Sequence, residues 1–530
     1  MFVSLYNIYI KQLEKKMLFD FAIIGFGVIG VETLYGIQKV FQQNKNKNKI
    51  KIVIIEKNLK NIPGGVAYSL ENSKFGYFNN PLRLSHPDFI EWFNLIDNRK
   101  KLIDFSQNNI NYNLNNWLNE NNLILKKNFK DYKEIYLPRL IYSFYLNDKI
   151  INFLNLKKKM KITLKFYNGE VGSLNNDNHF NIFSKKLFSE FSINFTKKKF
   201  ILKKNQFKST NKIRSKKIVI GTGIIPPKKI KEITIYKNSN YIWDFYSTGG
   251  TNNLIKKINV ISKIKKVVNI IFIGNKAGLL ETMQEIEKLI KIKKINIQIL
   301  CISKNTQTLQ KAERSKKFNF FEFKYLIKNN INKIKKAEYI LKLLKKEFKR
   351  AKLDGFNKYD VWTNVLKNKI ISTCYNQLSE NEKKHYNLSI FPLVRNITRY
   401  TYPDTVSAKN RLERANKIKF IKDRVITIIK HKNNLILKTQ SSKSIKGDIV
   451  INVSGPVSII DNKDEIKFIS SLKKITKKFN ERGFTPNNNF MLEKNLFLPG
   501  TLSNNFNPGR ETIIKAITKN SHKVAKNILS

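Results

Sequence analysis

The sequence predicts an α/β fold built on parallel sheets. Two stretches, residues 19–56 and 266–303, each have the order strand, turn, helix, strand, and their strands are continuous apolar runs of the kind buried in parallel sheets. The chain has 530 residues, of which 41% are hydrophobic, so it is long enough for two or three domains with a sizeable core. We therefore expect a globular protein with two Rossmann-like units.

The first unit begins with a strand at residues 19–24 and continues into a glycine-rich turn. A helix is expected from about residue 28 to residue 42, followed by a polar loop. The second strand, residues 51–56, is apolar and ends on Glu56. This order places an acid at the tip of the strand beside the turn.

The turn carries the spacing Gly25-x-Gly27-x-x-Gly30, which suits a dinucleotide. The first glycine allows a tight turn, the second lets a pyrophosphate approach the backbone, and the third lets the helix pack on the strand with its positive end towards the phosphate. Glu56, 26 residues after Gly30, can accept hydrogen bonds from an adenosine ribose. We expect Glu32, just inside the helix, to make only a favourable contact with the helix dipole.

The remaining elements follow from the same patterns. The second unit has strands at 267–273 and 295–302 around a helix at 277–290, and a further strand at 217–223 ends in a glycine-flanked turn. Residues 312–420 are expected to be mainly helical. The chain then returns to β structure at 448–456 and 496–500 and closes with a helix from about residue 512.

The formal net charge of +61 has two competing explanations, a polyanion-binding surface or a drift in composition. The chain has 13 Arg against 87 Lys, spread over almost every segment, whereas specific nucleic-acid readers depend on Arg. We favour drift and expect no specific nucleic-acid partner. Because Lys is the common cation of this chain, an Arg is a candidate for a site where the point charge of a Lys ammonium group would not be sufficient. These candidates are Arg83, Arg139, Arg395, Arg399, Arg411 and Arg510.

Cysteine and histidine usage gives no metal signature. Cys301 and Cys374 form no CxxC pair, and the five His residues show no ligand spacing. The apolar runs are too short for a membrane span, and residues 1–16 lack an apolar signal core. We expect a cytoplasmic protein without a bound metal, with residues 1–16 as an N-terminal extension.

The order of motifs resembles the two-dinucleotide-domain flavoproteins, and among them the bacterial FAD-NAD(P)-binding family that includes FAD-dependent urate hydroxylase-type proteins. The resemblance spans roughly residues 18–510, with weakly matched stretches around 150–210 and 312–440. The residues that carry it are the Gly25 turn, 64–68, 78–85, 89–92, 136–139, 220–223, 453–456 and 498–500.

The resemblance implies a Rossmann-like FAD domain interrupted by a second Rossmann-like NAD(P) domain with a mainly helical insertion. The expected boundaries are 17–250 and 441–530 for the FAD domain and 251–440 for the NAD(P)-binding-like domain. By the same resemblance, the residues near FAD would be Gly25, Gly27, Gly30, Glu56, Gly64, Gly65, Asn79, Pro81, Arg139, Thr222, Gly223 and Gly500.

The second unit departs from the family pattern. It keeps Gly274, but Lys276 and Leu279 occupy the other two glycine positions. Lys276 would either block a pyrophosphate or bind a phosphate directly. At the end of the second strand, Ser303-Lys304 replaces an acid, which favours NADP(H) over NAD(H) because a cation there can meet a 2′-phosphate. The alternative is a scaffold that has lost nucleotide binding.

These residues predict an FAD-dependent oxidoreductase acting on a small molecule. NAD(P)H would reduce the flavin, which would then hydroxylate a substrate with O₂ or pass electrons to another acceptor. The alternatives are a flavoprotein reduced by its own substrate and a basic binding protein on a flavoprotein scaffold. Fold alone does not decide among them. The sequence identifies no catalytic acid, base or nucleophile; His86, beside Pro87, is the nearest candidate.

The charge interpretation is testable by gel shift against salt. If drift explains the charge, binding to random and structured nucleic acids should be weak, indifferent to sequence and steeply lost as salt rises. Tight, selective binding at about 0.15 M salt would instead favour the binding-protein alternative.

Overall fold

A computed structural model describes residues 18–529 except for short gaps. The gaps are residues 45–48, 71–74, 109–111, 122–134, 177–178, 185–188, 197–198, 205–211, 224–226, 228–229, 233–239, 247–248, 307, 314, 316–320, 432–433, 456–466, 481–482 and 504–511. The predicted extension 1–16, Pro456 and Arg510 therefore lie outside the described residues.

The first sheet has a parallel centre in which β1 lies between β2 and β8. Its order is β22-β23-β8-β1-β2-β3-β6-β7, and the β4–β5 hairpin joins β8. The strands are β1 (Leu18–Ile24), β2 (Ile50–Glu56), β3 (Ile162–Asn168), β4 (Val171–Asn176), β5 (Phe180–Ser184), β6 (Ser189–Thr196), β7 (Lys199–Lys204), β8 (Lys212–Ile220), β22 (Met491–Glu493) and β23 (Leu496–Phe497).

Both faces of this sheet are covered, which explains its continuous apolar strands. Side chains of β1 alternate between the two faces, with Ile23 packed under the helices α2, α8 and α19 and Ile24 under the β4–β5 hairpin and α18. The helices of this lobe are α2 (Val28–Asn44), α3 (Gly65–Tyr68), α4 (Pro87–Asn94), α5 (Ile96–Asn108), α6 (Tyr112–Glu120), α8 (Arg139–Leu156), α18 (Lys467–Ile475) and α19 (Ile513–Leu529). The predicted first unit and final helix are confirmed.

The second sheet is also parallel, in the order β10-β19-β11-β12-β15. Helices α9, α10 and α17 cover one face, and the β18-β17-β16-β9 sheet covers the other. The bounds are β9 (Lys231–Glu232), β10 (Tyr241–Ile242), α9 (Gly250–Ile261), β11 (Val268–Ile273), α10 (Ala277–Lys291), β12 (Ile297–Ser303), α17 (Pro403–Arg414), β15 (Ile418–Lys422), β16 (Val425–His431), β17 (Asn434–Thr439), β18 (Ser444–Gly447) and β19 (Ile449–Asn452). The predicted second unit is confirmed.

Strand pairing corrects the expected domain boundaries of 17–250 and 441–530. β10 lies before residue 251 and β19 after residue 440, yet both belong to the second sheet. The four residues of β19 are buried between β10 and β11 because each is apolar or can satisfy its polar groups there. A short apolar strand does not itself reveal which of two sheets it joins, so the sequence placed β19 wrongly.

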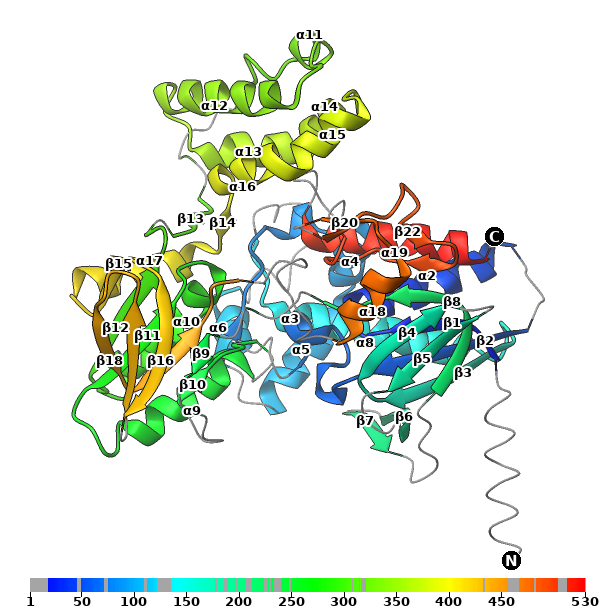
Figure 1. The fold of residues 1–530 in the computed structure, drawn as a ribbon, viewed down its shortest axis with the longest axis horizontal. Coiled ribbons are helices and arrows are strands. Elements are labelled where there is room, and N and C mark those ends of the chain that lie inside the picture. The colour runs from blue at the N-terminus through cyan, green and yellow to red at the C-terminus, as the bar shows by residue number, and fades with distance from the viewer. Residues whose placement is uncertain are drawn as a thin grey trace, which may run out of the picture.

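The helical insertion forms a third body with its own apolar core. It stands above the two sheet lobes in Figure 1 and connects to them through the short pair β13 (Gln310–Lys311) and β14 (Tyr400–Thr401). Its elements are α11 (Lys328–Ile331), α12 (Ala337–Leu353), α13 (Lys358–Lys367), α14 (Ile370–Asn376), α15 (Glu380–His385), a π-helical turn at Tyr386–Ile390, and α16 (Phe391–Ile397). The expectation of a mainly helical stretch is thus confirmed for its larger part, while β15 returns to the second sheet.

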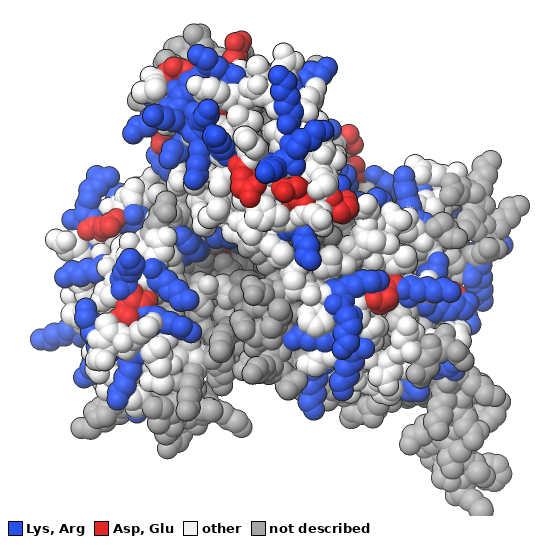
Figure 2. Space-filling view, turned by 45° about the horizontal axis from the view of Figure 1, so that its top comes forward, with Lys and Arg blue, Asp and Glu red and all other residues white. Residues whose placement is uncertain are grey.

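Positive charge is spread over the insertion and both sheet lobes on the face shown in Figure 2. Figure 2 shows Lys and Arg on the helical insertion and on both lobes of the face in view, with fewer Asp and Glu among them. Among the described residues, no helix is both long and apolar enough to cross a bilayer.

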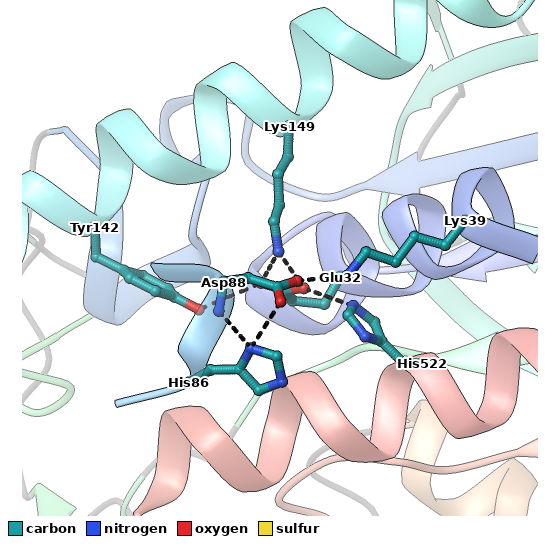
Figure 3. A network of polar contacts seen from close by, with 7 residues as sticks. All are labelled: Glu32, Lys39, His86, Asp88, Tyr142, Lys149 and His522. Atoms are coloured by element: carbon teal, nitrogen blue, oxygen red, sulfur yellow. Dashed lines mark hydrogen bonds and ion pairs between the residues drawn. The ribbon is translucent and has the colours of Figure 1, made fainter. Parts of the chain in front are cut away.

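A buried ion-pair network fastens α2 to α8 and α19 (Figure 3). The Glu32 side chain is fully buried, and its carboxylate accepts hydrogen bonds from Lys149 Nζ at 2.7 and 2.9 Å. His522 Nε2 of α19 lies 3.1 Å from the same carboxylate. Burial alone would raise the pKa of Glu32, but Lys149 and His522 hold it at about 2. Glu32 is therefore a core ion, and the expectation of a simple helix-dipole contact was wrong.

The network continues through α4. The His86 ring lies 5.8 Å from the His522 ring, and His86 Nδ1 accepts a hydrogen bond from the Asp88 backbone N–H at 3.3 Å. Asp88 in turn pairs with Lys39 of α2 at 2.7 Å. Burial lowers the pKa of His86 to about 4, so this ring caps α4 in its neutral form.

We predict that Glu32→Gln destabilises the fold by about 3–5 kcal/mol, because it leaves the Lys149 ammonium buried without its carboxylate. Since the folded pKa of Glu32 lies below its ordinary 4.5, its stabilisation is present above pH 4.5 and is lost as the pH falls towards 2. Urea unfolding as a function of pH measures both effects.

The matched control is Glu380→Gln, which removes an exposed Lys383 pair and should leave stability nearly unchanged. Equal unfolding midpoints for wild type and Glu32→Gln would contradict the prediction.

Candidate cofactor site

The turn between β1 and α2 is compact because glycine occupies each close contact. Gly25 has a φ of +93°, and its N–H donates to the Ile55 carbonyl at 2.8 Å, which ties the turn to β2. A Cβ on Gly25 would lie 2.9 Å from the Gly221 carbonyl group, and one on Gly30 would lie 2.4 Å from the Gly25 oxygen. The two positions therefore exclude any side chain, as the motif predicts.

Gly27, the second glycine of the motif, faces the pair Gly64 and Gly65. A Cβ on Gly27 would lie 3.1 Å from the Cα of Gly65, which begins the short helix α3. Gly64 precedes it with a φ of +96°. Backbone from the motif turn and from the 64–65 turn thus meets without intervening side chains, and this leaves peptide groups accessible to a phosphate.

Glu56 fixes the turn from the end of β2. One carboxylate oxygen accepts from the Phe26 N–H at 2.7 Å, and the other accepts from the Asn58 N–H at 2.9 Å. Burial raises the pKa of Glu56, while these backbone donors oppose the shift. A carboxylate oxygen can accept more than one hydrogen bond, so Glu56 retains capacity for ribose hydroxyl groups.

Segments distant in sequence complete this site. A Cβ on Gly500 would lie 2.2 Å from Ile29 in the first turn of α2 and 3.9 Å from the Thr222 carbonyl oxygen. The Thr222 hydroxyl is buried and has no hydrogen-bond partner among the described residues. Gly223, beside it, is exposed with open space where a Cβ would stand.

These features fit an FAD pyrophosphate and ribose. The glycines provide a backbone cradle at the N-terminus of a helix, Glu56 provides the ribose acceptor, and the Thr222 hydroxyl provides a buried polar group in need of a partner. The predicted residues Gly25, Gly27, Gly30, Glu56, Gly64, Gly65, Thr222 and Gly500 come together here, with Gly223 at the margin.

One predicted cofactor residue, Asn79, contacts the insertion linker. The Asn79 side-chain oxygen accepts from the Thr401 hydroxyl at 2.9 Å, and the Tyr77 ring stacks on Tyr402 with centroids 4.2 Å apart. Pro81 precedes the 3-10 turn Leu82–Leu84. The role of Asn79 and Pro81 in holding FAD stays a prediction.

Arg139, the first residue of α8, contacts the second lobe. Its Nη2 lies 2.5 Å from a carboxylate oxygen of Glu281 in α10, and its Nε donates to the Tyr77 carbonyl at 3.0 Å. This carboxylate engages the guanidinium group, which the resemblance had placed beside the flavin or its phosphates. The contact of Arg139 with FAD therefore remains untested.

The second glycine turn has the same backbone form but different side chains. Gly274 has a φ of +106°, and a Cβ there would lie 2.7 Å from the Val453 carbonyl oxygen. Gly278 packs equally closely on the Val453 side chain. Its turn is therefore built like the first one, and the helix α10 points its N-terminus at the end of the second sheet.

Cations take the place of the missing glycine and acid. Lys276 immediately precedes α10, and its pKa is lowered by burial and by the neighbouring Arg399 guanidinium. Lys304 is exposed at the end of β12, after Ser303. A nicotinamide nucleotide at this turn requires that Lys276 bind its phosphates or move aside from them. The contact of Lys304 with a 2′-phosphate stays a prediction.

Within the described residues, we identify no acid–base candidate besides His86. His86 caps α4 and contacts Asp88, which is a structural use of the ring. No group of three or more His, Cys, Asp or Glu within the described residues could hold a metal ion.

Comparisons with known proteins identify the class of fold. Residues 22–184 match the FAD-NAD(P)-binding family model, NAD_binding_9. No curated protein matches. The ornithine N-hydroxylase from Kutzneria sp. 744, solved with reduced FAD, NADP⁺ and L-ornithine, is 9% identical over 97% of this chain and 99% of its own, with a TM-score of 0.51.

Two further structures have similar coverage. The FAD-bound cadaverine monooxygenase of desferrioxamine biosynthesis from Erwinia amylovora is 11% identical over 97% of this chain and 95% of its own, with a TM-score of 0.49. The L-lysine 6-monooxygenase from Pseudomonas syringae is 9% identical over 96% and 99%, with a TM-score of 0.49. The family match and the fold confirm the resemblance to two-dinucleotide-domain flavoproteins.

Sequence reasoning missed the contacts between lobes. Glu281 lies in the helix that follows the second glycine turn and had no predicted role, and Thr401 and Tyr402 lie within the stretch 312–420 that was expected only to be mainly helical. The signal for Glu281 was its position in the first turns of the helix after a nucleotide motif. Nothing in the local sequence indicated Thr401.

We predict that Gly27→Glu yields colourless protein, because a carboxylate would stand against the pyrophosphate in a space that Gly64 and Gly65 leave for backbone alone. The ratio of visible flavin absorbance to protein absorbance in purified protein measures the loss.

Asn94→Glu, at an exposed helix end of the same lobe, adds the same charge away from the turn and should retain FAD. Wild-type protein that neither carries nor takes up FAD would end this interpretation.

Proposed function

We propose that this chain is an FAD-dependent oxidoreductase that uses a nicotinamide nucleotide as reductant and acts on a small molecule. One observation carries the proposal: the Gly25–Gly30 turn, the 64–65 turn, Glu56 and Gly500 converge on the N-terminus of α2. The family-model match over residues 22–184 supports the same conclusion. A bound flavin would supply the hydride and oxygen chemistry.

The chain's own residues would bind and orient. Peptide groups around Gly27 and Gly65 would hold the pyrophosphate, and Glu56 would hold the ribose. Lys276 and Lys304 would meet the phosphates of a nucleotide on the second sheet. The residues where the lobes meet, such as Tyr77 on Tyr402, would keep water from the space between the two cofactors.

A finer proposal is hydroxylation of a small amine with O₂. The fold likeness to an ornithine N-hydroxylase with bound FAD, NADP⁺ and L-ornithine supports it. The test is oxygen-dependent NADPH consumption in the presence of amino acids and diamines, with mass spectrometry for a product heavier by one oxygen atom. Consumption that yields only hydrogen peroxide would favour an oxidase or reductase.

The buried free thiols Cys301 and Cys374 are compatible with a reducing compartment, and we propose the cytoplasm. Fractionation of cells that express a tagged chain would test this location.

Anaerobic addition of NADPH or NADH tests the central proposal. Bleaching of the visible flavin band would support the nicotinamide-dependent function. A flavin bleached only by an organic substrate would favour the alternative flavoprotein reduced by its substrate. Protein without flavin that binds polyanions selectively would favour the scaffold alternative.

We predict that NADPH reduces the flavin faster than NADH, because Lys304 replaces the acid that would accept the 2′-hydroxyl of NADH. Lys304→Glu should weaken the preference for NADPH by about tenfold or more, the loss of one charge-assisted contact. Stopped-flow reduction under anaerobic conditions measures both rates.

Lys293→Glu, an exposed Lys before β12 and thus at its opposite end, is the matched control and should keep the wild-type preference. Equal wild-type rates with NADPH and NADH, or a preference for NADPH that survives Lys304→Glu, would remove the argument.

A further inference from the structure

One ion pair joins the two nucleotide lobes. Arg139 lies at the start of α8 in the first lobe, and Glu281 lies in α10 of the second, with Nη2 and Oε1 2.5 Å apart. Among the ion pairs between described residues, this is the one that connects the first sheet's lobe with the second. The pair is separated by 142 positions in sequence.

The pair is shielded and held on both sides. The two side chains are 12% and 13% exposed, so solvent screens their attraction weakly. Arg139 also donates to the Tyr77 carbonyl, and its side chain runs so close to Gly76 that a Cβ there would lie 3.0 Å away. These contacts restrict the geometry of the guanidinium group and thereby the position of Glu281.

Other contacts between the lobes are weaker or lie further along the interface. Lys288 of α10 donates to the Asn113 side chain of α6 at 3.2 Å. Thr401 donates to Asn79 at 2.9 Å, between the insertion linker and the first lobe. Each of these contacts includes at most one charged group. They therefore hold the lobes in place less strictly than the buried guanidinium of Arg139 and the carboxylate of Glu281.

The position of Glu281 in α10 connects the ion pair to the turn that would hold the nicotinamide nucleotide. Glu281 is the fifth residue of α10, one turn from Lys276 and the Gly274 turn that would hold the nicotinamide nucleotide. Any shift of Glu281 relative to Arg139 therefore moves the nucleotide phosphates relative to the first lobe. Because hydride donor and acceptor must approach closely, an ångström-scale shift is costly to the rate.

We propose that Arg139 and Glu281 are positioning residues that set the second nucleotide lobe at its working distance from the FAD lobe. The inference rests on the proposed function for its kinetic consequence, but not for the placement itself. It also gives Arg139 a role other than the cofactor contact implied by the family resemblance. Neither residue needs to touch a reacting atom.

A charge-swap series tests the placement. Arg139→Glu and Glu281→Arg each put like charges together, whereas the double variant restores an opposite pair. The matched control is the pair Arg411–Glu287, which uses the same helix α10 but joins it to α17 within the second lobe, with contacts of 2.7 and 2.8 Å. Small-angle X-ray scattering of the FAD-loaded protein, or of the protein as purified, measures lobe separation.

Each single swap at Arg139–Glu281 should increase the radius of gyration, and the double swap should return it towards the wild-type value. The Arg411–Glu287 series should leave it unchanged. An unchanged radius in every folded Arg139 and Glu281 variant would overturn the proposal. If a swap fails to fold, the near-isosteric Glu281→Gln serves in its place and should show a smaller increase, because it removes the attraction without adding repulsion.

The kinetic arm separates positioning from simple binding. Glu281→Gln should lower the flavin-reduction rate at saturating NADPH by about tenfold or more, with little change in the NADPH concentration needed for saturation. Weaker NADPH binding at an unchanged rate would overturn the positioning role. If the wild type is not reduced by either nucleotide, the proposed function fails, while scattering still decides the role of the ion pair.

Discussion

The first nucleotide unit depends on the buried carboxylate of Glu32. It stands one turn inside α2, the helix whose N-terminus faces the candidate pyrophosphate site, and it binds Lys149 of α8 and His522 of α19. Gly36, one turn further along α2, lets α19 approach until a Cβ would touch Ala525 at 2.8 Å. A charge in the core tolerates few geometries, so it fixes how three helices lie on the sheet and thereby where the turn at Gly25 can be.

Much of the fold was predictable because its signals are local. Apolar runs at 19–24 and 51–56, with glycines at the right spacing between them, determine a β–α–β unit over fewer than forty residues. Gly25 and Gly30 were predictable for the same reason, since one contacts the end of the adjacent strand β8 at Gly221 and the other contacts Gly25 within the turn. The mainly helical nature of the insertion was predicted from the sequence, whereas the contacts of its linkers were not.

The parts that escaped prediction are contacts between distant segments. His522 reaches Glu32 across 490 positions, and Arg139 reaches Glu281 across 142, so no spacing rule connects either pair. The strand β19 was assigned to the wrong lobe because a short strand of three apolar residues and one Asn suits the centre of either sheet. Lys149 shows the same limit. In a sequence with 87 Lys residues, nothing distinguishes the Lys that pairs with a buried carboxylate until that carboxylate, Glu32, is located in the structure.

The placement of β22, β23 and α19 has a consequence for biosynthesis. β23 completes the first sheet beside β8, and α19 closes over α2, yet these elements are made after the whole second lobe and the helical insertion. β8 ends at Ile220 and α19 begins at Ile513, so about three hundred residues are synthesised between them. During that time the face of α2 that carries Glu32 is not yet covered by α19. During that interval the second lobe can fold as a unit, whereas the first lobe cannot be completed until α19 has been synthesised. The nascent chain thus acquires its complete dinucleotide cradle only after the second lobe and the helical insertion have been made.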